Sequence, residues 1–129
     1  MTPDDPRAAA RRAHALGRRG EEIAAQLLVA RGFVVRERNA RLARAEFDLV
    51  AEDREGVAFV EVKSRTGTRF GEPWQAVDDR TRDRRVAAAM EWLARAGRPD
   101  ADFRFGVVSL VFDAAGGLVS SDWIDESAS

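Results

Sequence analysis

The alternation of hydrophobic and polar positions predicts a helix, three strands, a second helix and two strands. The first helix is expected from residue 6 to about 16, where glycines at 17 and 20 would interrupt or bend it before a helical stretch to about 31. Apolar runs predict strands from 33–35 and over 46–51, 57–64, 103–112 and 118–124. Another helix is expected over about 79–96, with Val86, Met90 and Leu93 on its buried stripe. This order implies an α/β fold with a central mixed β-sheet flanked by helices.

The 129 residues suffice for one domain, which we expect over 17–125, after an arginine-rich helical extension at 1–16 and before a frayed tail at 126–129. Cysteine is absent and His14 is the sole histidine, which excludes zinc–thiolate sites and argues against histidine metal clusters. No apolar stretch could span a bilayer, and the N-terminus lacks a signal-peptide pattern. A cytoplasmic protein without a membrane partner is therefore expected.

The net charge of -1 gives no global electrostatic argument for binding nucleic acid. Arginines nevertheless cluster locally. The clusters are Arg7, Arg11, Arg12, Arg18 and Arg19; Arg36, Arg38, Arg41 and Arg44; and Arg80, Arg82, Arg84 and Arg85. They would line a phosphate-binding surface if the fold brings them together, or they are solvated faces of helices and loops.

Four charged residues share the hairpin predicted over 46–64. If 53–56 forms the turn, Asp48 lies opposite Glu61 and Glu46 lies opposite Lys63. Alternation then places these four side chains on one face, and the reverse face carries Phe47, Leu49, Val60 and Val62. Opposed carboxylates repel each other and call for a counter-ion. Oxygen ligands without histidine or cysteine favour Mg²⁺ or Mn²⁺. The alternative is a surface ladder in which Glu46 pairs with Lys63 while Asp48 and Glu61 are solvated.

Lys63 is the single lysine in a chain with twenty arginines. An ammonium is a compact charge whose pKa can shift, whereas a guanidinium is a broad, permanently protonated fork. Chance would also leave one lysine. Its position two residues after Glu61 instead favours a role beside the carboxylates, where an ammonium can orient water or offset phosphate charge.

An ordered series of motifs extends this constellation along the chain: Gly17-Arg18-Arg19-Gly20-Glu21, Asn39, Glu46-Phe47-Asp48, Phe59-Val60-Glu61-Val62-Lys63-Ser64-Arg65 and Ala76-Val77. The series resembles the YraN family of small bacterial proteins, which is similar in fold to archaeal Holliday junction resolvases and restriction-endonuclease-like nucleases. The resemblance implies that Glu21, Asp48 and Glu61 bind Mg²⁺ or Mn²⁺ and that Lys63 joins them in catalysis. For Glu21 the alternative is a favourable interaction with the helix N-terminal dipole.

The resemblance implies a metal-dependent endonuclease that acts on DNA, with branched or structured DNA as the expected substrate. The candidate DNA-binding residues are Arg18, Arg19, Arg65, Arg80, Arg82 and Arg84. A symmetric homodimer would suit a junction, in which two equivalent strands are cut. The alternatives are a DNA-binding module with a degenerate site, using the arginines and Trp74, and an interaction protein that does not bind nucleic acid.

The sequence departs from the family pattern at three positions. Ala45 stands where the family usually has glycine, Thr81 where it usually has lysine, and Gly106 where it usually has aspartate. None of these departures removes an expected metal ligand. They concern contacts to the substrate.

Overall fold

The fold is that of a computed structural model, which describes residues 6–66 and 78–126. The elements within these ranges follow the order expected from the sequence. They are α1 (Pro6–Ala30), β1 (Val34–Arg41), β2 (Glu46–Asp53), β3 (Gly56–Thr66), α2 (Asp79–Arg95), β4 (Phe103–Phe112) and β5 (Leu118–Asp125). The segment 67–77, which includes Trp74, lies outside the described residues.

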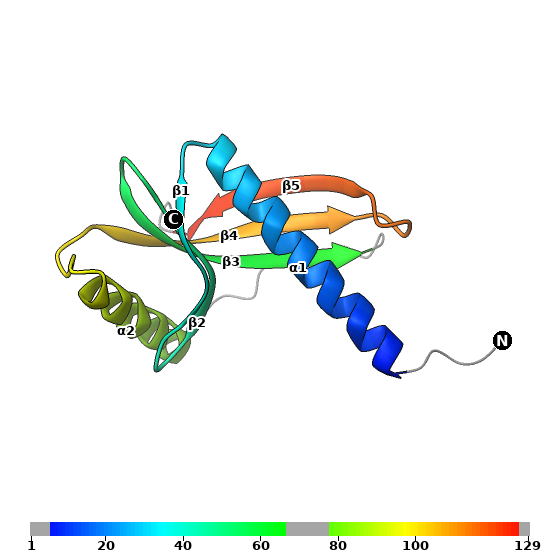
Figure 1. The fold of residues 1–129 in the computed structure, drawn as a ribbon. Helices are drawn as coiled ribbons and strands as arrows, with labels where there is room; N and C mark the ends of the chain where they lie inside the picture. Colours follow the sequence, from blue (N-terminus) through cyan, green and yellow to red (C-terminus); the bar gives the residue numbers. More distant parts are fainter. Residues whose placement is uncertain (1–5, 67–77, 127–129) are drawn as a thin grey trace.

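The described strands form one mixed sheet in the order β1-β2-β3-β4-β5. β3 and β4 are parallel, and the other neighbours are antiparallel. A parallel pair needs a long crossover connection, and α2 lies within it. In Figure 1, α1 crosses one side of β3, β4 and β5, while β1 and β2 run steeply across the direction of those strands. The expected α/β fold with a central mixed sheet flanked by helices is confirmed.

The core has two layers, one on each face of the sheet. Ala58 and Val60 of β3 are buried with Leu28 of α1, whereas Val57 and Phe59 are buried in the cluster that includes α2. Successive residues of a strand point to opposite faces, so a strand buried on both faces is apolar without interruption. This explains the continuous apolar run in the first half of β3.

α1 is one continuous helix, so the predicted interruption at Gly17 and Gly20 is wrong. Gly20 is buried, and a Cβ built on it would lie 2.5 Å from the Oγ of Ser64 in β3. Gly17 is exposed, and a Cβ there would meet no described atom within 4 Å. Gly20 therefore permits a close approach of helix and sheet.

α2 has the predicted extent, but its buried stripe differs. The residues buried on it are Ala88, Ala89, Trp92 and Leu93. Met90 is 57% exposed, so its predicted burial is wrong. The two alanines let α2 lie close to the aromatic residues of the sheet, and Trp92 packs edge-on against Phe59 with ring centroids 5.7 Å apart.

At the C-terminal end, Arg85 of α2 pairs with Glu126, with 3.2 Å between Nη1 and Oε2. The rest of the expected tail, residues 127–129, lies outside the described residues. Because α1 runs unbroken past residue 16, the division between extension and domain stays a prediction. None of the helices in the described ranges is long and apolar enough to cross a membrane.

Candidate acidic site

The β2–β3 hairpin has the predicted register as far as Leu49 and Val60, but the predicted pairs Asp48–Glu61 and Glu46–Lys63 are not part of the ladder. Glu52 pairs with Val57, and Asp53 pairs with Gly56, so the turn itself is only residues 54 and 55. The pairing of β2 with β3 stops at Leu49 and Val60, although β3 continues beside β4 to Thr66. The two strands diverge beyond this point, and we call the opening between them the fork.

Asp48 lies at the fork and is half-buried. Its Oδ2 accepts the backbone N–H of Val62 at 2.7 Å, so the carboxylate occupies the place of a strand carbonyl in a continued ladder. Burial raises the pKa of Asp48, and the hydrogen bond from Val62 partly opposes this shift. Neighbouring negative charges raise the pKa further, and they belong to Glu21, Glu61 and Glu46. Glu21, Glu61 and Glu46 therefore lie near enough to Asp48 for their charges to act on its carboxylate.

Strand alternation is broken at Asp48. Phe47 packs on Phe59 in the α2-side layer, with ring centroids 4.8 Å apart, whereas Leu49 is buried in the α1-side layer. The prediction that Phe47 and Leu49 share one face is therefore wrong. The register of β1 and β2 places Asn39 opposite Asp48, and Asn39 has a φ of 52°. Because alternation is interrupted at Asn39 and Asp48, side chains from both faces of the sheet can approach the fork.

Glu21 approaches the fork from α1. It is half-buried on the helix face of the buried Leu28, whereas Glu22 is exposed and pairs with Arg38 at 2.5 Å. Glu21 is therefore oriented toward the sheet. Because α1 begins at Pro6, Glu21 lies in the helix interior, where the N-terminal dipole does not explain it.

Lys63 and Glu61 form a pair at the rim of the fork. The Nζ of Lys63 lies 3.4 Å from Oε1 of Glu61, and the side chains are 47% and 49% exposed. Glu46 pairs instead with Arg41, with 3.6 Å between Nε and Oε1. The alternative ladder of Glu46 with Lys63 is therefore not the observed arrangement.

The donor atoms of the fork suit Mg²⁺ or Mn²⁺, because they are all carboxylate oxygens. Asp48 has no cationic partner among the described residues, and three like charges act on it. Among the described residues, no group of three or more histidine, cysteine, aspartate or glutamate side chains lies close enough together to hold a metal ion. An ion held by one or two carboxylates and completed by water fits this geometry, as is usual for Mg²⁺.

The model of the uncharacterised protein family UPF0102, the YraN family, matches residues 20–110. The chain belongs to this family. A UPF0102 protein from Anaeromyxobacter sp. is 41% identical over 120 residues, covering 93% of this chain and 89% of the relative. One from Nocardia farcinica is 44% identical over 97 residues, covering 75% of this chain and 76% of the relative.

A solved structure is similar at lower identity. The SfsA protein of Pyrococcus furiosus, in complex with Ca²⁺, matches with 19% identity and a TM-score of 0.41. The match covers 83% of this chain and 62% of the SfsA chain.

Two departures from the YraN pattern have structural reasons. The side chain of Thr81 hydrogen-bonds to Asp78, and its backbone N–H donates to the same side chain at 2.8 Å, so Thr81 belongs to the N-terminal cap of α2. A Cβ on Gly106 would lie 2.0 Å from the Trp123 ring, which packs edge-on against Phe33. Trp123 thus fills the space that a side chain at Gly106 would need.

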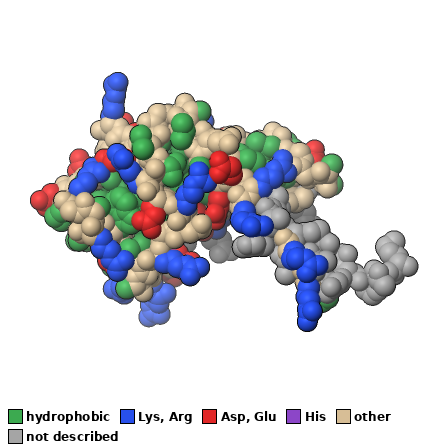
Figure 2. All heavy atoms as spheres, viewed as in Figure 1, with side chains coloured by type: hydrophobic (Ala, Val, Ile, Leu, Met, Phe, Trp, Pro, Cys, Tyr) green, Lys and Arg blue, Asp and Glu red, His purple; other side chains and the backbone are tan. Residues whose placement is uncertain are grey.

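The arginines predicted to bind DNA differ in their surroundings. Arg19 donates to the carbonyl of Gly116 at 2.6 Å and lies 5.3 Å from the ring centroid of Phe112, so it holds the β4–β5 turn. The others are exposed or half-buried; they are Arg18, Arg65, Arg80, Arg82 and Arg84. In Figure 2, basic side chains are spread over the visible face with acidic ones between them, and they form no single patch.

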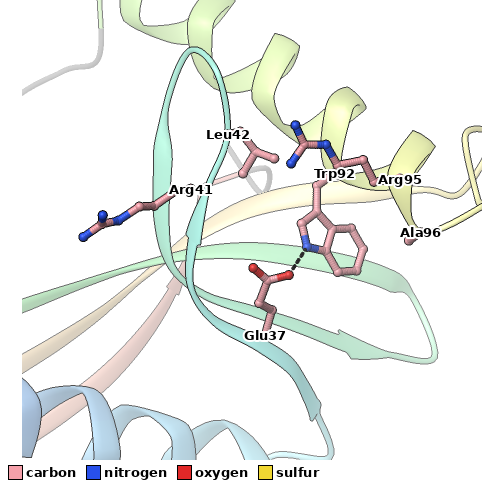
Figure 3. A pocket seen from close by; sticks show the side chains of 6 residues that line it. All are labelled: Glu37, Arg41, Leu42, Trp92, Arg95 and Ala96. Atoms are coloured by element: carbon pink, nitrogen blue, oxygen red, sulfur yellow. Dashed lines mark hydrogen bonds between the residues drawn. The ribbon is translucent and has the colours of Figure 1, made fainter.

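A separate cavity of about 190 Å³ lies on the α2 side of β1 (Figure 3). Trp92 donates its indole N–H to Glu37 there, with 3.0 Å between Nε1 and Oε1. The cavity is lined by Glu37, Arg41, Leu42, Trp92, Arg95 and Ala96. None of the predicted site residues of this YraN-family chain lines it, and the Trp92–Glu37 bond ties α2 to β1.

Sequence reasoning missed the part played by Asn39. It was noted only as one member of the family motif, although its side chain donates to Oε2 of Glu21 at 3.3 Å. A polar residue that tolerates φ > 0, placed in a strand opposite a candidate ligand, was the available signal.

Proposed function

We propose that this protein is a Mg²⁺- or Mn²⁺-dependent endonuclease that hydrolyses phosphodiester bonds of DNA, with branched or structured DNA as its substrate. The observation that supports this proposal is the gathering of Glu21, Asp48 and Glu61 at the fork beside Lys63. A sheet that only needed stability would not retain carboxylates whose charges oppose one another.

The residues of the fork suit distinct roles in such a reaction. When bound, Mg²⁺ or Mn²⁺ supplies Lewis acidity to the phosphate and lowers the pKa of a water molecule. Asp48 is fixed by its Val62 hydrogen bond, and its other oxygen, Oδ1, would bind the ion. Lys63, half-exposed at the rim, reaches toward solvent and would hold a phosphate oxygen or move a proton at Nζ. Glu61 orients this ammonium through their 3.4 Å contact.

DNA as the substrate implies a cytoplasmic protein, and junction DNA would suit a homodimer. The exposed arginines in the first turns of α2, Arg80, Arg82 and Arg84, are the candidates for phosphate contacts. Arg85 is excluded from this set. It pairs with Glu126, and its guanidinium carbon lies over the Phe105 ring, 4.6 Å from the ring centroid.

The test is a cleavage panel of duplex, single-stranded, flap and four-way-junction DNA with Mg²⁺, with Mn²⁺ and with chelator. The wild type is expected to cut at least one form only with metal, and Lys63→Ala is expected to be inactive while binding DNA in chelator like the wild type. Arg80→Gln combined with Arg82→Gln is expected to weaken binding in chelator, more so at low salt. Cleavage that persists in chelator, or in Lys63→Ala, would contradict the proposal.

A DNA-binding module without catalysis is the second candidate. Two observations favour it: Glu61 is already paired with Lys63, and the described residues contain no group of three or more histidine, cysteine, aspartate or glutamate side chains that could hold a metal ion. This candidate predicts binding of structured DNA in chelator with no cleavage under any metal condition.

A further inference from the structure

Asn39 occupies an unusual backbone position. Its φ of 52° is the single positive value of a non-glycine residue in the described part of the chain. The left-handed region is sterically unfavourable for most side chains and is tolerated best by glycine, asparagine and aspartate. A strand interior does not ordinarily need it, so the conformation calls for a local reason.

The reason lies in the side chains of β1. Glu37 contacts Trp92 of α2, and Ala40 is buried in the α2-side layer. Between them, Arg38 and Asn39 both face α1: Arg38 pairs with Glu22 at 2.5 Å, and Nδ2 of Asn39 donates to Oε2 of Glu21 at 3.3 Å. Consecutive strand residues normally point to opposite faces. The left-handed turn at Asn39 therefore directs its amide to the same helix as its neighbour.

The hydrogen bond from Asn39 restrains the carboxylate of Glu21, which the negative charge of Asp48 repels. The negative charge of Glu21 acts unfavourably on Asp48, and Glu21 has a long side chain that could swing into solvent. An amide hydrogen bond to the carboxylate opposes that movement. Asn39 also lies opposite Asp48 in the β1–β2 register, so it borders both acidic residues.

We propose that Asn39 is a positioning residue whose left-handed backbone conformation turns its side-chain amide toward α1, where it holds Glu21 beside Asp48. Asn39 would act through Glu21 and not on the metal or the DNA directly. This inference deepens the proposed function, because Glu21 is one of the fork carboxylates, but the placement it describes exists without metal and can be tested without it.

The test is a double-mutant cycle of thermal stability in chelator at low salt, at neutral pH. Glu21→Gln keeps an acceptor oxygen for Asn39 and removes the charge near Asp48, so it is expected to raise the melting temperature by about 2–4 °C. Asn39→Gly keeps the backbone conformation and removes the amide. In the Asn39→Gly background, the increase in melting temperature from Glu21→Gln is expected to fall to less than half. Without the amide, the Glu21 side chain can already move away from Asp48 into solvent.

Glu22→Gln is the matched control, since Glu22 pairs with Arg38. The change in melting temperature from Glu22→Gln is expected to be the same whether residue 39 is asparagine or glycine. In the protein that retains Asn39, Glu21→Gln should also shift the NMR resonances of the Asn39 side-chain amide, whereas Glu22→Gln should not. An equal gain from Glu21→Gln in both backgrounds, or unmoved amide resonances, would overturn the proposal. A chain that shows the coupling but cuts no DNA would contradict the endonuclease proposal alone.

Discussion

The carboxylate of Asp48 accepts the backbone N–H of Val62 across the fork between β2 and β3, with 2.7 Å between Oδ2 and the nitrogen. The Asp48 side chain thus lies where the pairing of β2 with β3 ends, and the charges of Glu21 and Glu61 act on it. An unpaired buried N–H costs about 1–3 kcal/mol, so this hydrogen bond retains an acidic residue where its charge is otherwise unfavourable.

We expect Asp48→Asn to stabilise the metal-free protein. Asparagine keeps an oxygen for the Val62 N–H and removes the charge that Glu21 and Glu61 oppose. Because the pKa of Asp48 is raised in the folded state, the folded protein binds this proton more tightly than the unfolded chain. Its ionisation therefore reduces stability as the pH rises through the unfolded-state pKa toward the folded-state pKa. The gain from Asp48→Asn should be largest at neutral pH and should vanish in strong acid, as measured by thermal denaturation in chelator.

Two controls accompany this measurement. Asp48→Ala removes the acceptor as well as the charge, so it should gain less than Asp48→Asn or lose stability. Millimolar Mn²⁺ should raise the melting temperature of the wild type by mass action and leave Asp48→Asn unchanged. A wild type whose melting temperature does not respond to Mn²⁺ would argue against an ion at the fork.

A second prediction concerns the contact between α1 and β3. Gly20→Ala should destabilise the fold by about 1–3 kcal/mol, because a Cβ there would lie 2.5 Å from Ser64 Oγ. Gly17→Ala should instead stabilise it by about 0.5–1 kcal/mol, since this glycine is exposed and helical. Ser64→Ala should recover much of the loss in Gly20→Ala. Chemical denaturation measures all three effects, and the same sign for both glycines would refute the close-approach explanation.

The two glycines also show what the sequence could predict. Their helix-breaking tendency was visible, but the contact that makes Gly20 necessary lies in β3, far along the chain. The register of the hairpin was predictable because apolar runs flank a short turn, and this register brought Asp48 near Glu61. The fork was not predictable, since alternation assumes that β2 and β3 stay paired, whereas their pairing ends at Leu49 and Val60. The burial of Met90 was predicted wrongly for a related reason. Periodicity predicts that α2 has an apolar stripe, but the packing of Trp92 on Phe59 decides which residues of that stripe are buried.

A third prediction concerns acid stability at the end of the sheet away from the fork. Hydrogen bonds from Arg98 lower the pKa of Glu52 to about 2, against partial burial, and Arg36 contributes further. Because this pKa is depressed in the folded state, the stabilisation is complete above the ordinary value of 4.5 and is lost as the pH falls from there toward about 2. Arg98→Gln should flatten this part of the stability–pH profile, measured by urea denaturation. Arg54→Gln, at an exposed turn position, should leave the profile unchanged.

The last prediction concerns the single lysine. We expect Lys63→Arg to abolish metal-dependent DNA cleavage nearly as completely as Lys63→Ala. A guanidinium would retain the charge and would still pair with Glu61, but it is broad and planar, so it would not reproduce the position of the compact ammonium relative to a bound phosphate. If only positive charge mattered, a chain with twenty arginines would tolerate one more here. The measurement compares single-turnover cleavage with DNA affinity in chelator, where Lys63→Arg should bind like the wild type. Cleavage by Lys63→Arg at a rate close to that of the wild type would reduce the role of Lys63 to charge alone.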